Sequence, residues 1–197
     1  MKKQLTALCF TLLLSTVFAF TTNAASFSDV PITHRYYKEI TALSNLGVIK
    51  GYEDGTFKPG VYVTRAQSLN ILDRVPNISV LPIRDMREFS DLKRAYPYYA
   101  VFERFYRGGI INGDGNFMYP SNIVTRGQIA KMFTLYFTFK ATNNVSFIDV
   151  PSNSDKYPYV SALAANNVTT GDAGYFYPNK HLTREHLAVW LYRALYN

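Results

Sequence analysis

The sequence predicts a mainly α-helical protein built from three similar helix–loop–helix repeats. A Phe-x-Asp triplet opens each repeat, at residues 27–29, 89–91 and 147–149. Apolar residues at helical spacing follow each triplet, and then a glycine, a proline and a Thr-Arg dipeptide come in the same order. Repeats this short bury their apolar faces only against one another. We therefore expect one compact pseudo-threefold bundle, made of repeats 26–86, 87–144 and 145–197.

The first 25 residues have the composition of a secretory signal peptide. Lys2 and Lys3 precede an apolar run from Leu5 to Phe20, and small residues follow at 22–25. The run is shorter than the roughly 20 apolar residues that cross a bilayer, and polar residues interrupt it. We therefore expect cleavage, export, and no membrane span in the mature chain. An uncleaved anchor is the alternative.

Cleavage would change both the charge and the cysteine content. The full chain has 21 Lys and Arg residues, 14 Asp and Glu residues, a formal net charge of +7 and one cysteine, Cys9. The mature chain would be basic and free of thiols, which excludes an intrachain disulfide. An exported basic protein meets anionic wall glycans rather than nucleic acids, so no nucleic-acid partner is expected.

The first helix of repeat 1 is expected over about residues 34–46. Ile40 and Leu43 lie on one face at helical spacing, and Gly47 tolerates the positive φ that ends a helix. Residues 52–57 then form a turn around an Asp-Gly dipeptide. The other two repeats have apolar residues and turn residues at corresponding places.

A second helix is expected to begin after the threonine of each Thr-Arg dipeptide. Thr64 with Gln67, and Thr125 with Gln128, have the spacing of a capping box. His186 stands at the glutamine position of the third repeat, so its box is expected to be incomplete. The inward faces are expected to be Ala66, Leu69 and Leu72, then Ile129, Met132 and Phe133, then Leu187, Trp190 and Leu191.

The order Phe-Ser-Asp-Val, helix, Gly-Val-Ile-Lys-Gly-Tyr-x-Asp-Gly-Thr-Phe-x-Pro, Val-Thr-Arg-Ala-Gln resembles an S-layer homology (SLH) repeat. The chain from Phe27 to about Tyr196 resembles three such repeats in tandem. The resemblance implies a pseudo-threefold, α-helical, three-pronged spindle with a central helix bundle. It also implies a secreted, non-catalytic module at the bacterial cell surface, which binds an acidic, often pyruvylated secondary cell-wall polysaccharide in grooves between repeats.

The family motif Ile-Thr-Arg-Ala-Glu matches residues 63–67, 124–128 and 182–186, and places Arg65, Arg126 and Arg184 in first helical turns. The helix dipole does not favour a cation there. The resemblance implies a bidentate grip on a sugar carboxylate, assisted by the free amides of the helix N-terminus. The alternative is a tether to a carbonyl or an aspartate of an adjacent repeat. Glu185 would neutralise its neighbour, so we rank Arg184 below the other two.

Three further kinds of residue complete the candidate glycan site. The aspartates of the triplets either cap a turn or pair with an arginine, or they accept hydrogen bonds from sugar hydroxyls. Two tyrosines near the family's usual tryptophan position, where repeat 1 has Arg35, are candidates to stack on a sugar. The repeated glycines serve turn geometry or allow close approach of a glycan. These residues are Asp29, Asp91 and Asp149, Tyr96 and Tyr157, and Gly51, Gly113 and Gly171.

No catalytic or metal-binding pattern accompanies these residues. His34, His181 and His186 are the only histidines, and residues 112–116 lack the acids of a calcium loop. We therefore expect no metal, no cofactor and no enzyme activity. A wall hydrolase with paired carboxylates is left open by the sequence, because the distance between two carboxylates depends on the fold. The alternative function is a structural or adaptor surface protein whose repeats bind a protein partner or peptidoglycan.

Overall fold

The computed structural model describes residues 27–141 and 146–196, so the expected signal peptide and Cys9 lie outside the described residues. The described part is helical and contains no β-strand longer than isolated bridges. Each repeat contributes two helices, which confirms the predicted fold class. The helices are α1 (Tyr37–Asn45), α2 (Arg65–Leu72), α3 (Tyr99–Arg107), α4 (Arg126–Tyr136), α5 (Tyr157–Ala165) and α6 (Arg184–Tyr196).

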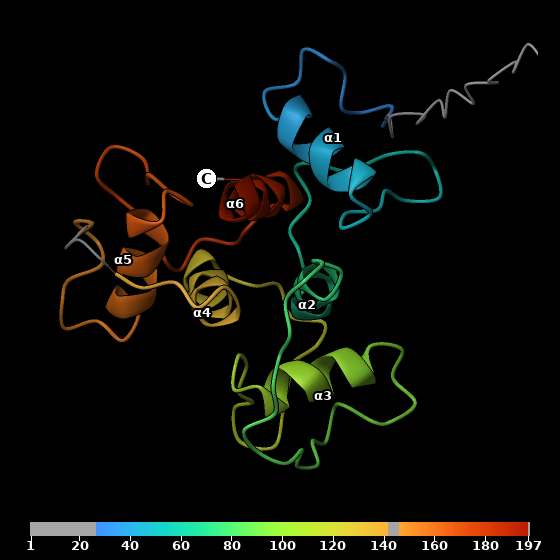
Figure 1. Ribbon diagram of the computed structural model, residues 1–197, viewed down its shortest axis with the longest axis vertical. Coiled ribbons are helices and arrows are strands. Elements are labelled where there is room, and N and C mark those ends of the chain that lie inside the picture. Colours follow the sequence, from blue (N-terminus) through green and yellow to red (C-terminus); the bar gives the residue numbers. More distant parts are fainter. Residues whose placement is uncertain (1–26, 142–145, 197) are drawn as a thin grey trace, which may run out of the picture.

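The helices form three prongs around a common centre. Helices α2, α4 and α6 lie in the middle, with α1, α3 and α5 outside them (Figure 1). The contacts pair α2 with α3, α4 with α5, and α6 with α1. Each prong therefore joins the second helix of one repeat to the first helix of the next, and the third repeat closes on the first. The predicted spindle is confirmed, and its prongs cross the repeat boundaries.

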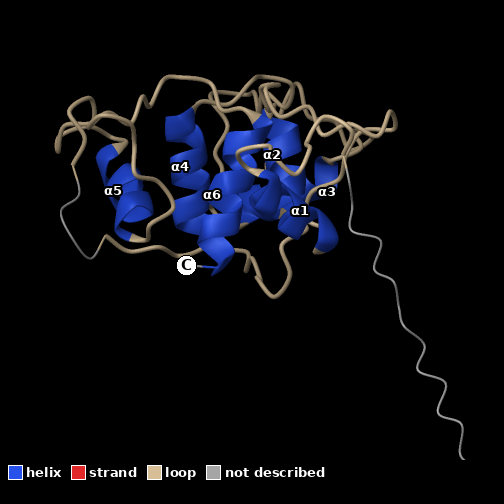
Figure 2. Ribbon diagram, turned by 90° about the horizontal axis from the view of Figure 1, so that it is seen from above, coloured by secondary structure: helices blue, strands red, loops and turns tan. Residues whose placement is uncertain are grey.

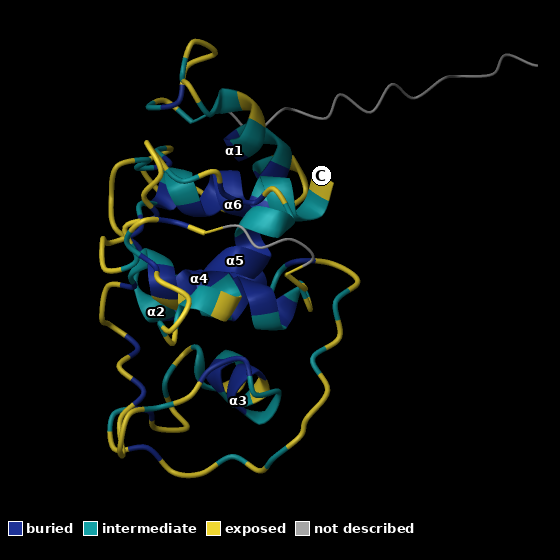
Figure 3. Cartoon of the chain, turned by 90° about the vertical axis from the view of Figure 1, so that its left-hand side faces the viewer, coloured by how far each residue is buried: buried dark blue, intermediate teal, exposed yellow. Residues whose placement is uncertain are grey.

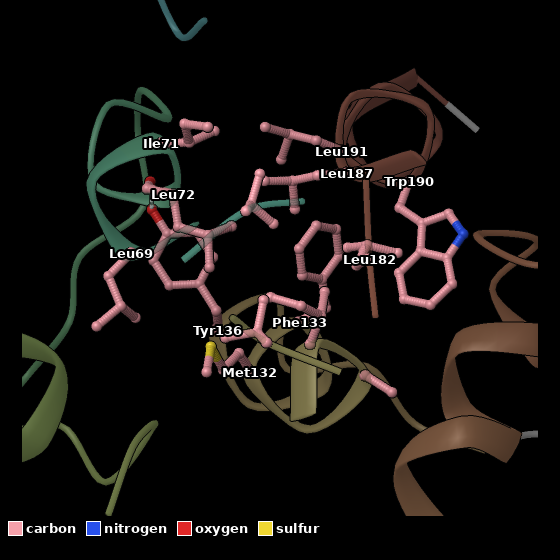
Figure 4. Close-up of a cluster of buried hydrophobic side chains, with 14 of the residues drawn as sticks. Leu69, Ile71, Leu72, Met132, Phe133, Tyr136, Leu182, Leu187, Trp190 and Leu191 are labelled. Atoms are coloured by element: carbon pink, nitrogen blue, oxygen red, sulfur yellow. Dashed lines mark hydrogen bonds between the residues drawn. The ribbon is translucent and has the colours of Figure 1, made fainter. Parts of the chain in front are cut away.

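The central bundle is held together by apolar side chains of α2, α4 and α6. All nine residues expected on the inward faces are buried. Leu69, Leu72, Phe133, Leu187 and Leu191 are fully buried, and they meet in the centre of the bundle (Figure 4). Burial is concentrated on the helices, whereas many loop residues are exposed (Figure 3). The buried hydroxyl of Tyr136 donates to the carbonyl of Leu72, 2.8 Å away, and links α4 to α2.

The helix ends follow the expected local chemistry. Both complete capping boxes form, from Thr64 with Gln67 and from Thr125 with Gln128. Gly47 follows α1 with a φ of 75°, as predicted. Helix α1 begins three residues later than expected, because turns occupy the preceding segment. None of the helices in the described part is both long and apolar enough to cross a membrane.

The segments that enter α2, α4 and α6 meet in a closed ring of hydrogen bonds. The amide of Val63 donates to Leu182, the amide of Leu182 to Val124, and the amide of Val124 to Val63, over 3.0–3.1 Å. Many connecting loops lie along one side of the helices (Figure 2). The ring fixes the three second helices at their N-termini, where the candidate arginines stand.

Candidate functional site

The aspartate of each Phe-x-Asp triplet holds a loop of its own repeat. Both oxygens of Asp149 accept backbone N–H groups, from Phe176 at 2.8 Å and Tyr177 at 2.7 Å. Asp91 holds Met118 and Tyr119 in the same way, and Asp29 holds Phe57 and Lys58. In each pair the second residue has a left-handed backbone, at Lys58 (φ 59°), Tyr119 (φ 53°) and Tyr177 (φ 58°). The carboxylates thus support an unfavourable backbone conformation rather than cap a helix.

The repeated glycines make room for the phenylalanine of the same triplet. A Cβ atom on Gly113 would overlap the ring of Phe89 and approach the carbonyl oxygen of Phe117. Gly51 and Gly171 stand in the same relation to Phe27 and Phe147. Packing within the repeat therefore accounts for a glycine at these three positions.

The first-turn amides of α2, α4 and α6 are occupied by neighbouring repeats. In α2, the amide of Arg65 donates to Asn122 at 2.8 Å and the amide of Ala66 to Pro120 at 2.9 Å. The corresponding amides of α4 donate to repeat 3, and those of α6 to repeat 1. The threonine hydroxyl accepts the third amide. The expectation that free helix amides would assist a ligand is therefore wrong.

The three arginines reach from one repeat to the next. Arg65 donates through Nη2 to the carbonyl of Asn112 at 2.7 Å, and Arg126 donates through Nε to that of Phe176 at 2.7 Å. Arg184 donates through Nε to Phe57 at 2.9 Å and through Nη2 to Lys50 at 3.1 Å. These contacts are the tethers to an adjacent repeat that sequence analysis gave as the alternative to ligand binding. They link repeat 1 to repeat 2, repeat 2 to repeat 3, and repeat 3 to repeat 1.

Burial sets the electrostatic state of these arginines. Desolvation lowers the pKa of Arg65, Arg126 and Arg184, while the aspartate of the next repeat acts in the opposite direction. Arg184 is the most enclosed, with 6% of its surface exposed. Its neighbour Glu185 lies 3.7 Å from Nε2 of His34 instead. Burial, rather than the expected Glu185 pairing, therefore withdraws Arg184 from solvent.

Arg126 differs from the other two arginines in the state of its terminal nitrogens. Its guanidinium carbon lies 4.8 Å from the ring centroids of both Phe176 and Trp190. Among the described residues, none accepts a hydrogen bond from its Nη1 or Nη2. The aromatic rings and the tether hold this guanidinium in place and leave both of its terminal nitrogens open.

The open side of Arg126 faces a cavity of about 520 Å³ between repeats 2, 3 and 1, here called the Arg126 groove. Four of its lining residues are arginines or lysines, and Asp172 is the one acid among them. His186 lines it too, and burial lowers the pKa of its imidazole. The residues that define the groove are Arg35, Arg126, Lys180 and Arg193, with Tyr36, Tyr62, Tyr177, His181 and His186. This groove is therefore suited to an anion.

A second cavity, of about 440 Å³, lies at the equivalent place between repeats 1 and 2, and is here called the Arg65 groove. Arg65 and Asp114 are its two charged residues. Asn122, Thr125 and Gln128 supply uncharged polar groups. The sequence ranks Arg65 together with Arg126, but the structure places them in grooves of different charge.

The structure places Tyr96 and Tyr157 outside both grooves. The amide of Tyr96 donates to the carbonyl of Lys93 as the amide of His34 does to that of Pro31, so Tyr96 corresponds to His34. The amide of Tyr157 donates to the carbonyl of Ser154 as the amide of Tyr37 does to that of His34, so Tyr157 corresponds to Tyr37. These tyrosines and Arg35 are therefore not equivalent to one another. Two tyrosines at matching positions line the grooves instead, Tyr119 and Tyr177, and sequence analysis missed both. Their signal is the Tyr-Pro dipeptide of repeats 2 and 3.

The described residues contain no cluster of three or more His, Cys, Asp or Glu side chains that would hold a metal ion. His181 and His186 line the Arg126 groove, but the carboxylate beside His186 in the chain, Glu185, contacts His34. The chemistry that this region offers is thus hydrogen bonding, positive charge and aromatic surface.

Comparisons with known proteins agree with this architecture. Residues 26–67, 88–130 and 146–188 match the model of the S-layer homology domain. The S-layer protein EA1 of Bacillus anthracis is 29% identical over 177 residues, which cover 84% of this chain and 20% of that protein. The exoglucanase XynX of Acetivibrio thermocellus is 30% identical over 164 residues, 79% of this chain and 15% of that protein.

An amylopullulanase of Thermoanaerobacterium thermosulfurigenes is 29% identical over 164 residues, which are 79% of this chain and 9% of that enzyme. The chain thus spans about a fifth or less of the length of these relatives. The three segments matched by the family model run from the Phe-x-Asp triplets into the second helices and cover more than half of the sequence. The chain belongs to the S-layer homology domain family.

Proposed function

We propose that this chain is a secreted, non-catalytic module that anchors protein to the bacterial wall by binding an acidic secondary cell-wall polysaccharide. S-layer homology domains of S-layer proteins and cell-surface enzymes anchor those proteins to the cell wall. The polysaccharide proposed for this chain carries carboxylates, as on pyruvate ketals. The observation that carries the proposal is the open guanidinium edge of Arg126 in a cationic groove.

The groove offers a carboxylate a prepared partner. A guanidinium with two free terminal nitrogens binds a carboxylate through two parallel hydrogen bonds. Phe176 and Trp190 both pack against the Arg126 guanidinium, so little side-chain entropy is lost on binding. Lys180 and Arg193 add positive charge to the same lining. Together these groups favour an anionic sugar over a neutral one.

Aromatic rings on the groove wall suit the rest of the sugar. Tyr36, Tyr62 and Tyr177 line the cavity, and Tyr177 stacks on Tyr175 with centroids 5.7 Å apart. A tyrosine presents an apolar ring and a hydroxyl, which match the C–H face and the hydroxyl edge of a pyranose. The groove thus combines carboxylate recognition with contacts to the ring that bears the carboxylate.

Co-sedimentation with purified wall sacculi tests the proposal. The protein is expected to pellet with sacculi that retain the secondary polymer and to stay in solution once that polymer has been extracted. Arg126→Ala is expected to weaken binding about a hundredfold, and Arg126→Lys to recover only part, because an ammonium cannot bind bidentately. Arg94→Ala removes an equal charge outside the Arg126 groove and serves as the control.

Equal pelleting after extraction of the polymer would contradict the proposal. Circular dichroism of Arg126→Ala verifies that loss of its tether to Phe176 has not unfolded the protein. Arg184→Ala is the second comparison, because Arg184 makes two tethering bonds and is buried. If Arg184→Ala weakens binding as much as Arg126→Ala in folded protein, the open guanidinium edge is not the binding element.

A further inference from the structure

The two grooves are built on one template but differ in chemistry. In each groove the Thr-Arg arginine of one repeat lies against the next repeat in the chain. That next repeat lines the groove with residues at matching positions, from its loop glycine to the third residue of its second helix. At three matching positions the Arg126 groove has a cation or a histidine where the Arg65 groove has an uncharged side chain. The pairs are Lys180 and Asn122, His181 and Ile123, and His186 and Gln128.

Arg65 itself is less available than Arg126. Its Nη2 is bound to Asn112, and its Nε is buried with no hydrogen-bond acceptor among the described residues. Asp114 is the one acid on the groove lining, so the lining has one positive and one negative charge. The Arg65 groove therefore lacks the excess positive charge that would select an anion.

Tyr119 gives the Arg65 groove an aromatic wall. Its left-handed backbone is held by Asp91, and its ring stacks on that of Phe117 with centroids 5.6 Å apart and planes tilted by 28°. About 40% of each residue stays exposed to solvent. Tyr119 lines the cavity and Phe117 supports its ring, so Tyr119 offers a half-exposed aromatic platform that fits the C–H face of a pyranose.

Uncharged polar groups lie around this platform. The Gln128 side chain uses its oxygen to accept the Thr125 amide, which leaves its NH₂ group as a donor. The Asn122 side chain makes no hydrogen bond with another described residue. Ile123 adds an exposed apolar contact. Amide donors and acceptors beside apolar contacts match the hydroxyl and acetamido groups of an N-acetylhexosamine.

We propose that the Arg65 groove is a second subsite, which binds an uncharged N-acetylhexosamine unit of the wall glycan while the Arg126 groove binds the acidic unit. The proposal rests on the proposed function for the identity of the glycan, but the uncharged sugar is recognised independently of the acidic one. The chain then binds two different sugars of the glycan in two structurally equivalent grooves, rather than the same sugar in each groove.

Titration calorimetry with two probes tests this division. The uncharged probe is N,N′-diacetylchitobiose, and the acidic probe is a pyruvate-ketal derivative of a hexose that has no acetamido group. Tyr119→Ala is expected to weaken binding of the uncharged probe about tenfold and to leave the acidic probe unchanged. Tyr177→Ala, the matched substitution in the Arg126 groove, and Arg126→Ala are expected to do the opposite. Asn122→Ala repeats the first test without touching the aromatic platform.

The two proposals fail in different ways. If the uncharged probe does not bind at millimolar concentration, or if Tyr177→Ala weakens it as much as Tyr119→Ala, the second subsite is refuted while the acidic site stands. If the acidic probe alone fails to bind, the proposed function is refuted and the uncharged subsite stands. Tyr119 already has a positive φ, so alanine adds no new backbone strain there, and thermal unfolding verifies that the variant is folded.

Discussion

Replacing Asp149 by asparagine tests how the repeat holds its groove loop. The two carboxylate oxygens accept the amides of Phe176 and Tyr177 at 2.8 and 2.7 Å. Asparagine keeps one acceptor and points an NH₂ group at the second amide. A hydrogen bond to a charged acceptor contributes about 1.5–3 kcal/mol, and the exposed position of Tyr177 places its bond at the lower end. Because the substitution removes one bond and also takes the charge from the acceptor of the other, we expect Asp149→Asn to lower the free energy of unfolding by about 3 kcal/mol.

Urea denaturation followed by circular dichroism measures this loss. With a slope of roughly 2 kcal/mol per molar urea for a chain of this size, the midpoint would fall by about 1.5 M. Asp172→Asn is the matched control, because Asp172 lines the same groove and its carboxylate accepts no hydrogen bond from a described residue. We expect it to change stability by less than about 0.5 kcal/mol. Coincident unfolding curves for the two variants would refute the proposed role of Asp149.

Three other predictions follow from packing, hydrogen bonding and charge. Gly113→Ala is expected to destabilise the fold by about 2 kcal/mol because of the ring against it, whereas Gly60→Ala, with open space around it, is expected to be neutral in the same urea assay. Tyr136→Phe is expected to cost about 1–2 kcal/mol, because a carbonyl of α2 loses its buried donor; an unchanged melting temperature would contradict this. Burial keeps the pKa of His186 below its ordinary value of 6.5 in the folded state, so stability is full above that value and falls as the pH drops through the folded pKa. His186→Gln is therefore expected to flatten the loss of stability between pH 7.5 and pH 5, and an identical pH profile would refute the link.

Local features of the fold were predictable because they depend on neighbours in the sequence. The capping boxes of Thr64 and Thr125 need only residues three apart, and the inward face of α2 needs only the helical period. The pairing of α1 with α6 was not predictable, because spacing within a repeat does not say which neighbour covers its first helix. The cross-repeat prongs are a property of the closed cycle.

The candidate site was predictable in position but not in chemistry. Sequence analysis located Arg126 at the start of a helix. It could not show that Nε of Arg126 donates to the carbonyl of Phe176 while Nη1 and Nη2 stay open. It chose Tyr96 and Tyr157 because they stand near the start of the first helix, where the family usually has a tryptophan. The structure instead brings Tyr119 and Tyr177 to the grooves, because Asp91 and Asp149 hold the backbone amides of these two tyrosines in the groove loops.

Because the third repeat packs on the first, the first repeat cannot complete its packing until the end of the chain has been synthesised. Helix α1 stands near the N-terminus of the described chain, and its buried residues Ile40 and Leu43 belong to a prong completed by α6, residues 184–196. During synthesis this apolar surface stays uncovered until the last helix has left the ribosome. Contacts between residues so distant in the sequence also form slowly. A nascent chain stopped before α6 would leave one prong unsealed and open to chaperones or to aggregation. The N-terminal repeat therefore reaches its final packing only when the C-terminal one has been made.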